Sequence, residues 1–162
     1  MSRKKSGTKT SKTLYDLLIK AKVSLTSIED VGSDSVEIKN HVRGKVSGRY
    51  YSGAHIDTTE GTMMMDGSMQ FNVKFIHFTS KGEMVVGQGA ASQDPVDRSG
   101  KAMFSGEATT WTRSTRLSSL NGARWQFDGT YNSSGESIEA RCTLVEKGRP
   151  QGTEDESSSQ SS

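Results

Sequence analysis

Hydrophobic and polar side chains alternate at every second position through most of the chain beyond Ser35. Between His41 and Tyr51, one face carries small or apolar residues and the other carries Arg, Lys, His and Ser. A period of two is typical of a strand that buries one face. The segments with strand-like patterns are 35–39, 41–51, 58–65, 68–79, 83–92, 101–111, 123–132 and 137–146. They predict an all-β domain of seven or eight strands.

Short turn sequences separate many of these strands. Asp66-Gly67 is a strong two-residue hairpin signal, and Lys81-Gly82 and the segment 133–136 mark further turns. Short connections favour strands that pair with their neighbours in the chain, and strand glycines allow the bends that a closed sheet requires. We therefore expect a single antiparallel up-and-down β-barrel, with a β-sandwich as the alternative.

A different pattern precedes the strands. In Thr13–Lys22, the residues Leu14, Leu17, Leu18 and Ala21 recur at helical spacing, and Thr13 is an acceptable N-cap. This spacing predicts one short N-terminal helix that docks on the barrel through its leucines. The alternative is an edge strand from Leu17 to Leu25.

The two ends of the chain differ from the middle in charge and composition. Residues 1–11 are basic and polar, and residues 149–162 are acidic and rich in serine, so both are expected to be disordered tails around a barrel domain at 12–148. Five basic residues within 1–13 and three acidic ones within 150–162 leave 16 of each sign between them. This neutral body disfavours a nucleic-acid-binding domain, although the basic tail could make nonspecific contacts.

The cysteine count and the lack of long apolar stretches indicate in which compartment the protein is expected. Cys142 is the single cysteine, so no intramolecular disulfide is expected and a buried, unreactive thiol is the simplest interpretation. No apolar stretch approaches 18 residues, and the basic start lacks the apolar core of a signal peptide. We expect a cytoplasmic protein without a membrane span.

The segment from Gly100 to Glu136 has a more specific sequence pattern. A strand of the form G-x-x-x-F-x-G precedes a loop of the form R-L-x-x-L-x-G and a strand ending in a glycine and an aromatic residue. The residues that carry this pattern are Gly100, Phe104, Gly106, Arg116, Leu117, Leu120, Gly122, Phe127, Gly129 and Tyr131. The run resembles the closing half of small calycin-like barrels, in particular allene oxide cyclase-like barrels and related bacterial barrels. The resemblance implies a calycin-like fold. The members of these barrel families include plant enzymes that cyclise an unstable epoxide. No catalytic residues can be transferred from it one by one.

The barrel interpretation predicts an apolar lumen. Leu117 and Leu120 are expected to plug one mouth. The predicted ligand-binding lining is Phe71, Phe75, His77, Trp111, Trp125, Phe127 and Tyr131. No metal site and no cofactor are predicted. Met63-Met64-Met65 is interpreted as packing, because consecutive strand residues point to opposite faces and cannot converge on one ion.

Two side chains are candidates for acid–base chemistry. His77 shares a strand face with Phe71, Val73 and Phe75, where an imidazole could bind a ligand or move a proton. Glu107 would be a lumen carboxylate if its face of the strand 101–111 points inward, but the opposite face is an equally credible core. His41 and His55 are expected at the surface.

Three functions fit this sequence. The leading hypothesis is a barrel that binds a small hydrophobic molecule. The alternatives are a cyclase or isomerase that acts on a reactive hydrophobic substrate in the lumen, and a structural or interaction barrel whose lumen is filled. The low hydrophobic content of 31% also suggests a homo-oligomer, since association would bury further apolar surface.

Overall fold

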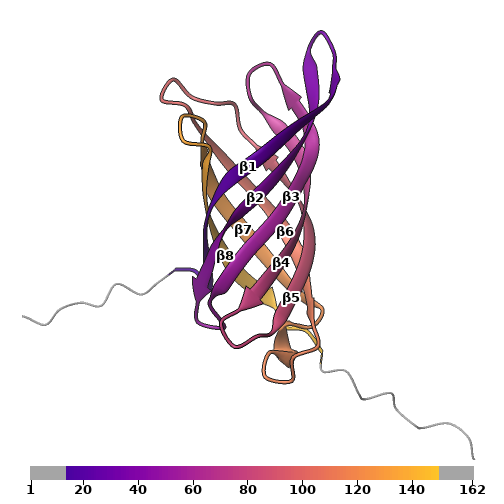
Figure 1. Ribbon diagram of the computed structural model, residues 1–162, viewed down its shortest axis with the longest axis vertical. Coiled ribbons are helices and arrows are strands. Elements are labelled where there is room, and N and C mark those ends of the chain that lie inside the picture. Colours follow the sequence, from indigo (N-terminus) through magenta and orange to yellow (C-terminus); the bar gives the residue numbers. More distant parts are fainter. Residues whose placement is uncertain (1–13, 150–162) are drawn as a thin grey trace, which may run out of the picture.

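Eight β-strands pair in chain order: the alternating segments form seven of them, because 35–39 and 41–51 belong to one strand, and the first strand comes from the segment predicted as a helix. The computed structural model describes residues 14–149. Its strands are β1 (Leu17–Val31), β2 (Ser35–Gly48), β3 (Gly53–Met64), β4 (Met69–Thr79), β5 (Met84–Gln93), β6 (Lys101–Thr112), β7 (Ala123–Asn132) and β8 (Ser137–Glu146). Each is antiparallel to its neighbours and β8 pairs with β1, so the sheet closes into a barrel (Figure 1). The predicted up-and-down barrel is confirmed, and the β-sandwich alternative is wrong.

The predicted N-terminal helix is not present in the described residues. Leu17–Lys22 belong to β1, where they pair with β2 on one side and with β8 on the other. Leu17, Ile19 and Ala21 are buried on the inner face. These pairs satisfy the backbone of β8, which would otherwise be an exposed edge, and this outweighs a short helix that is marginal alone. Thr13 lies outside the described residues, as do residues 1–11 and all but one residue of the predicted C-terminal tail.

β3 begins earlier than its sequence indicates. The expected strand starts at position 58, whereas the observed one starts at Gly53 and pairs with β4 from its first residue. A Cβ at Gly53 would lie 2.0 Å from the carbonyl oxygen of Phe78, so only glycine allows this close approach of the two strands. The extension brings His55 into the sheet.

One end of the barrel is sealed by apolar side chains. Leu117 and the short 3₁₀ helix Ser118–Leu120 lie between β6 and β7, and the exposed fractions of Leu117 and Leu120 are 3% and 0%. They pack with Val85, Ala123 and Trp125 in the core. The plug predicted for these two leucines is confirmed.

Hydrogen bonds hold this plug against the barrel wall. The indole N–H of Trp125 donates to the hydroxyl of Thr110 at 2.9 Å, and that hydroxyl donates to the carbonyl of Leu120 at 2.8 Å. Gly122 then turns the chain into β7 with a φ of +76°, a conformation that favours glycine. The interior at this end is therefore fixed in place.

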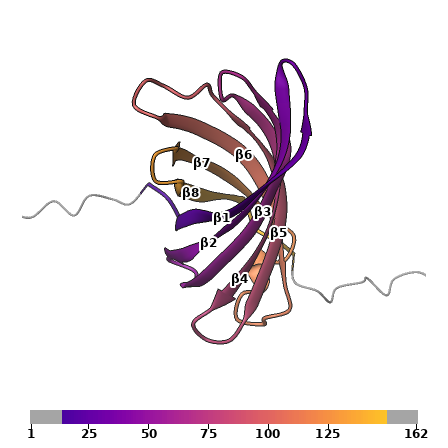
Figure 2. The ribbon, with the colours of Figure 1, turned by 45° about the horizontal axis from the view of Figure 1, so that its top comes forward.

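The other end is open. It carries the β1–β2, β3–β4 and β7–β8 turns and the β5–β6 loop (Figures 1 and 2). Pairing of β1 with β8 stops at Lys22 and Ser137, whereas pairing of β1 with β2 continues to Val31. The β1–β2 hairpin therefore extends one wall beyond β8.

No helix within residues 14–149 is long and apolar enough to cross a membrane.

Candidate functional site

The barrel encloses a cavity of about 450 Å³. This volume lies within the range that small-molecule sites occupy. Most of the side chains around it are aliphatic or aromatic; they include Ile19, Val42, Val73, Ile138, Phe71, Phe75, Phe104, Trp125 and Phe127. Ile28 and Glu136 also line it and are exposed, whereas the leucine plug closes the opposite end. Access from solvent is therefore from the end with the long β1–β2 hairpin.

A chain of four polar side chains crosses the inner wall. The Tyr51 hydroxyl lies 2.6 Å from Nδ1 of His77, and Nε2 of His77 lies 2.8 Å from Nδ1 of His55. Nε2 of His55 lies 2.6 Å from Oδ2 of Asp57. Strand register explains this arrangement, because His55 and His77 are direct partners across β3 and β4, and Asp57 is two residues from His55 on the same face.

The chemistry of the four groups gives these hydrogen bonds one direction. With Asp57 as a carboxylate, Nε2–H of a neutral His55 donates to it, which leaves Nδ1 of His55 as an acceptor. Nε2–H of His77 then donates to His55, and the Tyr51 hydroxyl donates to His77. In this arrangement each N–H and O–H donor of these four side chains has an acceptor.

Burial keeps Tyr51 and His77 uncharged. It lowers the pKa of His77 to about 3, with a further contribution from the neighbouring His55. It also raises the pKa of the Tyr51 hydroxyl far above its usual range, so that this group keeps its proton. His77 therefore acts as an uncharged link between Tyr51 and His55 at neutral pH.

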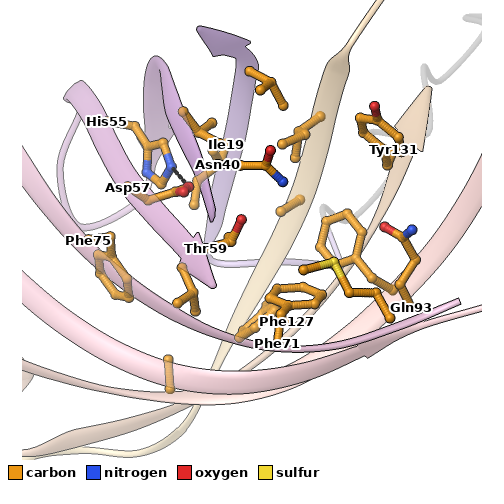
Figure 3. Close-up of a pocket in the computed structure, with 18 of the residues that line it drawn as sticks. Ile19, Asn40, His55, Asp57, Thr59, Phe71, Phe75, Gln93, Phe127 and Tyr131 are labelled. Atoms are coloured by element: carbon orange, nitrogen blue, oxygen red, sulfur yellow. Dashed lines mark hydrogen bonds and ion pairs between the residues drawn. The ribbon is translucent and has the colours of Figure 1, made fainter. Parts of the chain in front are cut away.

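This series of hydrogen-bonded side chains ends at a carboxylate oxygen of Asp57 that lacks a hydrogen-bond partner in the described residues. Asp57 is 9% exposed, and its Oδ1 is buried without a hydrogen-bond partner in the described structure. Asp57 also lines the cavity, and Figure 3 shows it among the lumen side chains beside His55. A buried polar atom without a partner costs about 1–3 kcal/mol. A ligand that donated a hydrogen bond to Oδ1 would recover part of that cost.

A second polar group lies on the adjacent strand. Asn40 of β2 lines the cavity and is the direct partner of Thr59 on β3, which is two residues from Asp57. The Thr26 hydroxyl donates to Oδ1 of Asn40 at 2.6 Å. Because its oxygen is engaged, the Asn40 side chain offers its amide N–H groups to the lumen.

The structure places most of the predicted lining residues around the cavity. These are Phe71, Phe75, His77, Trp125, Phe127 and Tyr131. Trp111 is different, since it is 40% exposed on the outer face of β6 and does not line the cavity. On that strand Ala102, Ala108 and Thr110 are the buried residues.

Glu107 shares the outer face of β6 with Trp111. Its side chain is 63% exposed and lies 3.8 Å from Arg124, outside the cavity. Its predicted catalytic role required an inward carboxylate, so Glu107 is wrong as a lumen acid or base. His77 is in the lumen as that prediction required, although its pKa favours a neutral link in the chain.

Sequence reasoning missed Tyr51, His55 and Asp57 as site residues. His55 was expected in a surface turn, yet it is 4% exposed within β3. One signal was available: His55 and Asp57 alternate as His-x-Asp, the spacing that puts both side chains on one strand face. His41, also expected at the surface, is half-buried.

Cys142 is buried as predicted, whereas only one of the three consecutive methionines lies inside the barrel. Cys142 is buried in the core, and burial raises its thiol pKa to about 12, which disfavours the nucleophilic thiolate. Met63 lines the cavity, whereas Met64 and Met65 are exposed. Among residues 14–149, no group of three or more His, Cys, Asp or Glu side chains is arranged to hold a metal ion.

Comparisons with known proteins support the fold. No protein-family model and no curated protein matches the sequence. Among solved structures, a conserved protein of unknown function from Rhodopseudomonas palustris has a TM-score of 0.66 at 13% identity, over 80% of this chain and 94% of that one. A β-barrel-like protein from Acinetobacter baumannii has a TM-score of 0.67 at 11% identity, over 79% and 91%.

An enzyme from Penicillium herquei is also similar. Its TM-score is 0.54 at 15% identity, over 83% of this chain and 98% of that chain. At such identities the likeness extends to the fold alone. It supports the small-barrel part of the resemblance seen in the sequence.

Proposed function

We propose that the protein binds a small, predominantly apolar molecule in the barrel lumen. The observation that carries this proposal is the cavity of about 450 Å³, closed at one end by the leucine plug and lined mainly by apolar side chains. An eight-stranded barrel either fills its interior with its own side chains or holds one small ligand. The open cavity favours the second case over a filled barrel with a purely structural role.

The polar groups in the lumen define the ligand further. Oδ1 of Asp57 has no hydrogen-bond partner within the described part of the chain, so it favours a ligand that carries a hydroxyl or another hydrogen-bond donor. Aromatic side chains surround the remaining space, with Phe71 near Phe104 and Phe104 near Phe127 at ring-centroid distances of 6.3 Å. The ligand we propose is an apolar molecule with one polar end.

Quenching of tryptophan fluorescence tests this proposal directly. Trp125 lines the cavity and Trp111 lies outside it. We expect 10-bromodecan-1-ol, which joins a hydroxyl to an apolar chain with a quenching bromine, to bind in the lumen and quench Trp125. Trp111→Phe should keep the saturable quench and Trp125→Phe should lose it. The melting temperature of the wild type should rise with ligand concentration, as binding to the native state requires.

The two tryptophan variants serve as controls for each other. If both proteins were quenched equally, or only the one retaining Trp111, the molecule would bind on the outer face and the lumen proposal would fail. An unchanged melting temperature at saturating concentrations of the alcohol would also count against it.

A further inference from the structure

We propose that Asp57 is a general base that moves a proton within a carbonyl compound bound in the lumen. The expected reaction is an isomerisation in which a carbon–carbon double bond moves into conjugation with the carbonyl group. This inference rests on the proposed ligand-binding function and adds a substrate class and a reaction to the same site.

The environment of Asp57 suits a base. His55 holds Oδ2 through a 2.6 Å hydrogen bond, while Oδ1 is buried without a hydrogen-bond partner among residues 14–149, on a side chain that lines the cavity. His55 is in turn held by His77, and His77 by Tyr51. These three residues position the carboxylate, so that Oδ1 is the atom left to accept a proton from a bound molecule.

Asn40 supplies the complementary donor. It lies diagonally from Asp57 across the β2–β3 pair, because its direct partner is Thr59. Such diagonal neighbours are separated by about 7–8 Å. Figure 3 shows Asn40 and Asp57 on the same part of the lumen wall. A small carbonyl compound between them can accept a hydrogen bond from the Asn40 amide while one of its C–H groups faces Asp57.

The reaction is balanced without an oxidant or reductant. Oδ1 of Asp57 removes a proton from the carbon between the carbonyl and the double bond of a β,γ-unsaturated ketone. The electrons of that C–H bond form a dienolate, whose oxygen accepts a hydrogen bond from Asn40. The carboxylic acid of Asp57 then returns the proton to the γ-carbon. A new C–H bond forms there, the double bond lies between the α- and β-carbons, and Asp57 is a carboxylate again.

The apolar surroundings assist both steps. The lining offers few polar groups that could protonate the dienolate at the wrong carbon, and the low local dielectric strengthens the hydrogen bond from Asn40. A substrate made largely of hydrocarbon fits the aromatic wall formed by Phe71, Phe75 and Phe127.

Exchange of carbon-bound hydrogen tests the base without knowledge of the natural substrate. The probe is 2-tetralone, an apolar bicyclic ketone with acidic α-hydrogens, incubated with the full chain in D₂O and followed by ¹H NMR. We expect the wild type to exchange these hydrogens at least tenfold faster than buffer. Asp57→Asn should lower the protein-catalysed rate by about 100-fold, the scale of general-base catalysis.

Two further variants make this result specific. Asp128→Asn removes an exposed carboxylate from β7 and should leave exchange unchanged. Asn40→Leu keeps Asp57 but removes the amide donor, and should lower exchange by about tenfold or more. If Asp57→Asn did not fold, as judged by its melting curve, the Asn40→Leu rate would decide; an unchanged rate in that variant would overturn the paired role of the two residues.

Binding of N-phenyl-1-naphthylamine, whose emission rises in apolar sites, separates this inference from the proposed function. Displacement of this dye by 2-tetralone, together with exchange that depends on Asp57, supports both. Displacement without exchange overturns the base and leaves the ligand site standing. Dye binding with neither displacement nor exchange overturns the carbonyl substrate class. Absence of dye binding overturns the lumen site and the base together.

Discussion

Replacement of Thr59 by tryptophan is expected to weaken ligand binding in the lumen by about two orders of magnitude. Thr59 lies on β3 between Asn40 of β2 and Val73 of β4, and its side chain lines the cavity (Figure 3). An indole at this position would occupy space that a ligand needs, and the barrel wall limits how far it can move aside. We expect the Kd for N-phenyl-1-naphthylamine, measured from its emission, to rise by roughly 100-fold, or about 2.7 kcal/mol.

The matched control places the same side chain outside the barrel. Thr143 is an exposed residue of β8, so Thr143→Trp makes the identical exchange away from the cavity. It should bind the dye like the wild type. If Thr59→Trp retained full affinity while its melting temperature stayed near that of the wild type, the dye would be binding elsewhere and the lumen would lose its proposed role.

Acid should destabilise the protein through His77 before most carboxylates are protonated. In the unfolded chain this histidine titrates near 6.5, whereas burial in the folded barrel lowers its pKa to about 3. Below pH 6.5 the unfolded state therefore binds the extra proton and the folded state does not. The stabilisation from neutral His77 is present above pH 6.5 and is lost progressively as the pH falls towards 3. Between pH 7.5 and pH 5 the expected loss is about 2 kcal/mol.

Urea unfolding at several pH values between 7.5 and 5 measures this loss. In His77→Gln the contribution should be absent, so that the free energy of unfolding depends less on pH even though the variant is less stable overall. His41→Gln removes a half-buried histidine outside the chain of four and should keep the slope that His77 causes. Equal slopes in the wild type and His77→Gln would show that burial of His77 is not what couples folding to pH.

Several features of the fold follow from local sequence. Strict alternation from Ser35 onward, with Asp66-Gly67 and other turns between the segments, was enough to predict antiparallel strands in chain order and a closed barrel. The alternation of Phe71, Val73, Phe75 and His77 put these side chains on one face, and they do line one cavity. These predictions succeed because a period of two is fixed by strand geometry, whatever the strand packs against.

The first strand shows where local pattern is ambiguous. Leucines at 14, 17 and 18 fit a helix, but Leu17, Ile19 and Ala21 also fit the inner face of a strand. The choice depends on β8, whose backbone needs a partner along Ser137–Cys142 to close the barrel. That need is a property of the whole sheet, and no short window of sequence contains it.

The inner face of β6 and the start of β3 depend on closure of the whole barrel. Both faces of β6 carry apolar residues. Closure of the barrel turns Phe104 inward, so that it lines the cavity and its ring packs on Gly129. A Cβ at position 129 would collide with this ring. Glu107 is thereby directed to solvent. Local sequence was enough to predict β2 to β8, their order along the chain and six residues of the lumen wall. The tertiary structure brought His55 opposite His77, 22 residues away in the chain, and so assembled Tyr51, both histidines and Asp57. Which residues face each other on neighbouring strands depends on closure of the barrel and on the glycine at the start of β3. Alternation along one strand cannot specify these contacts between strands.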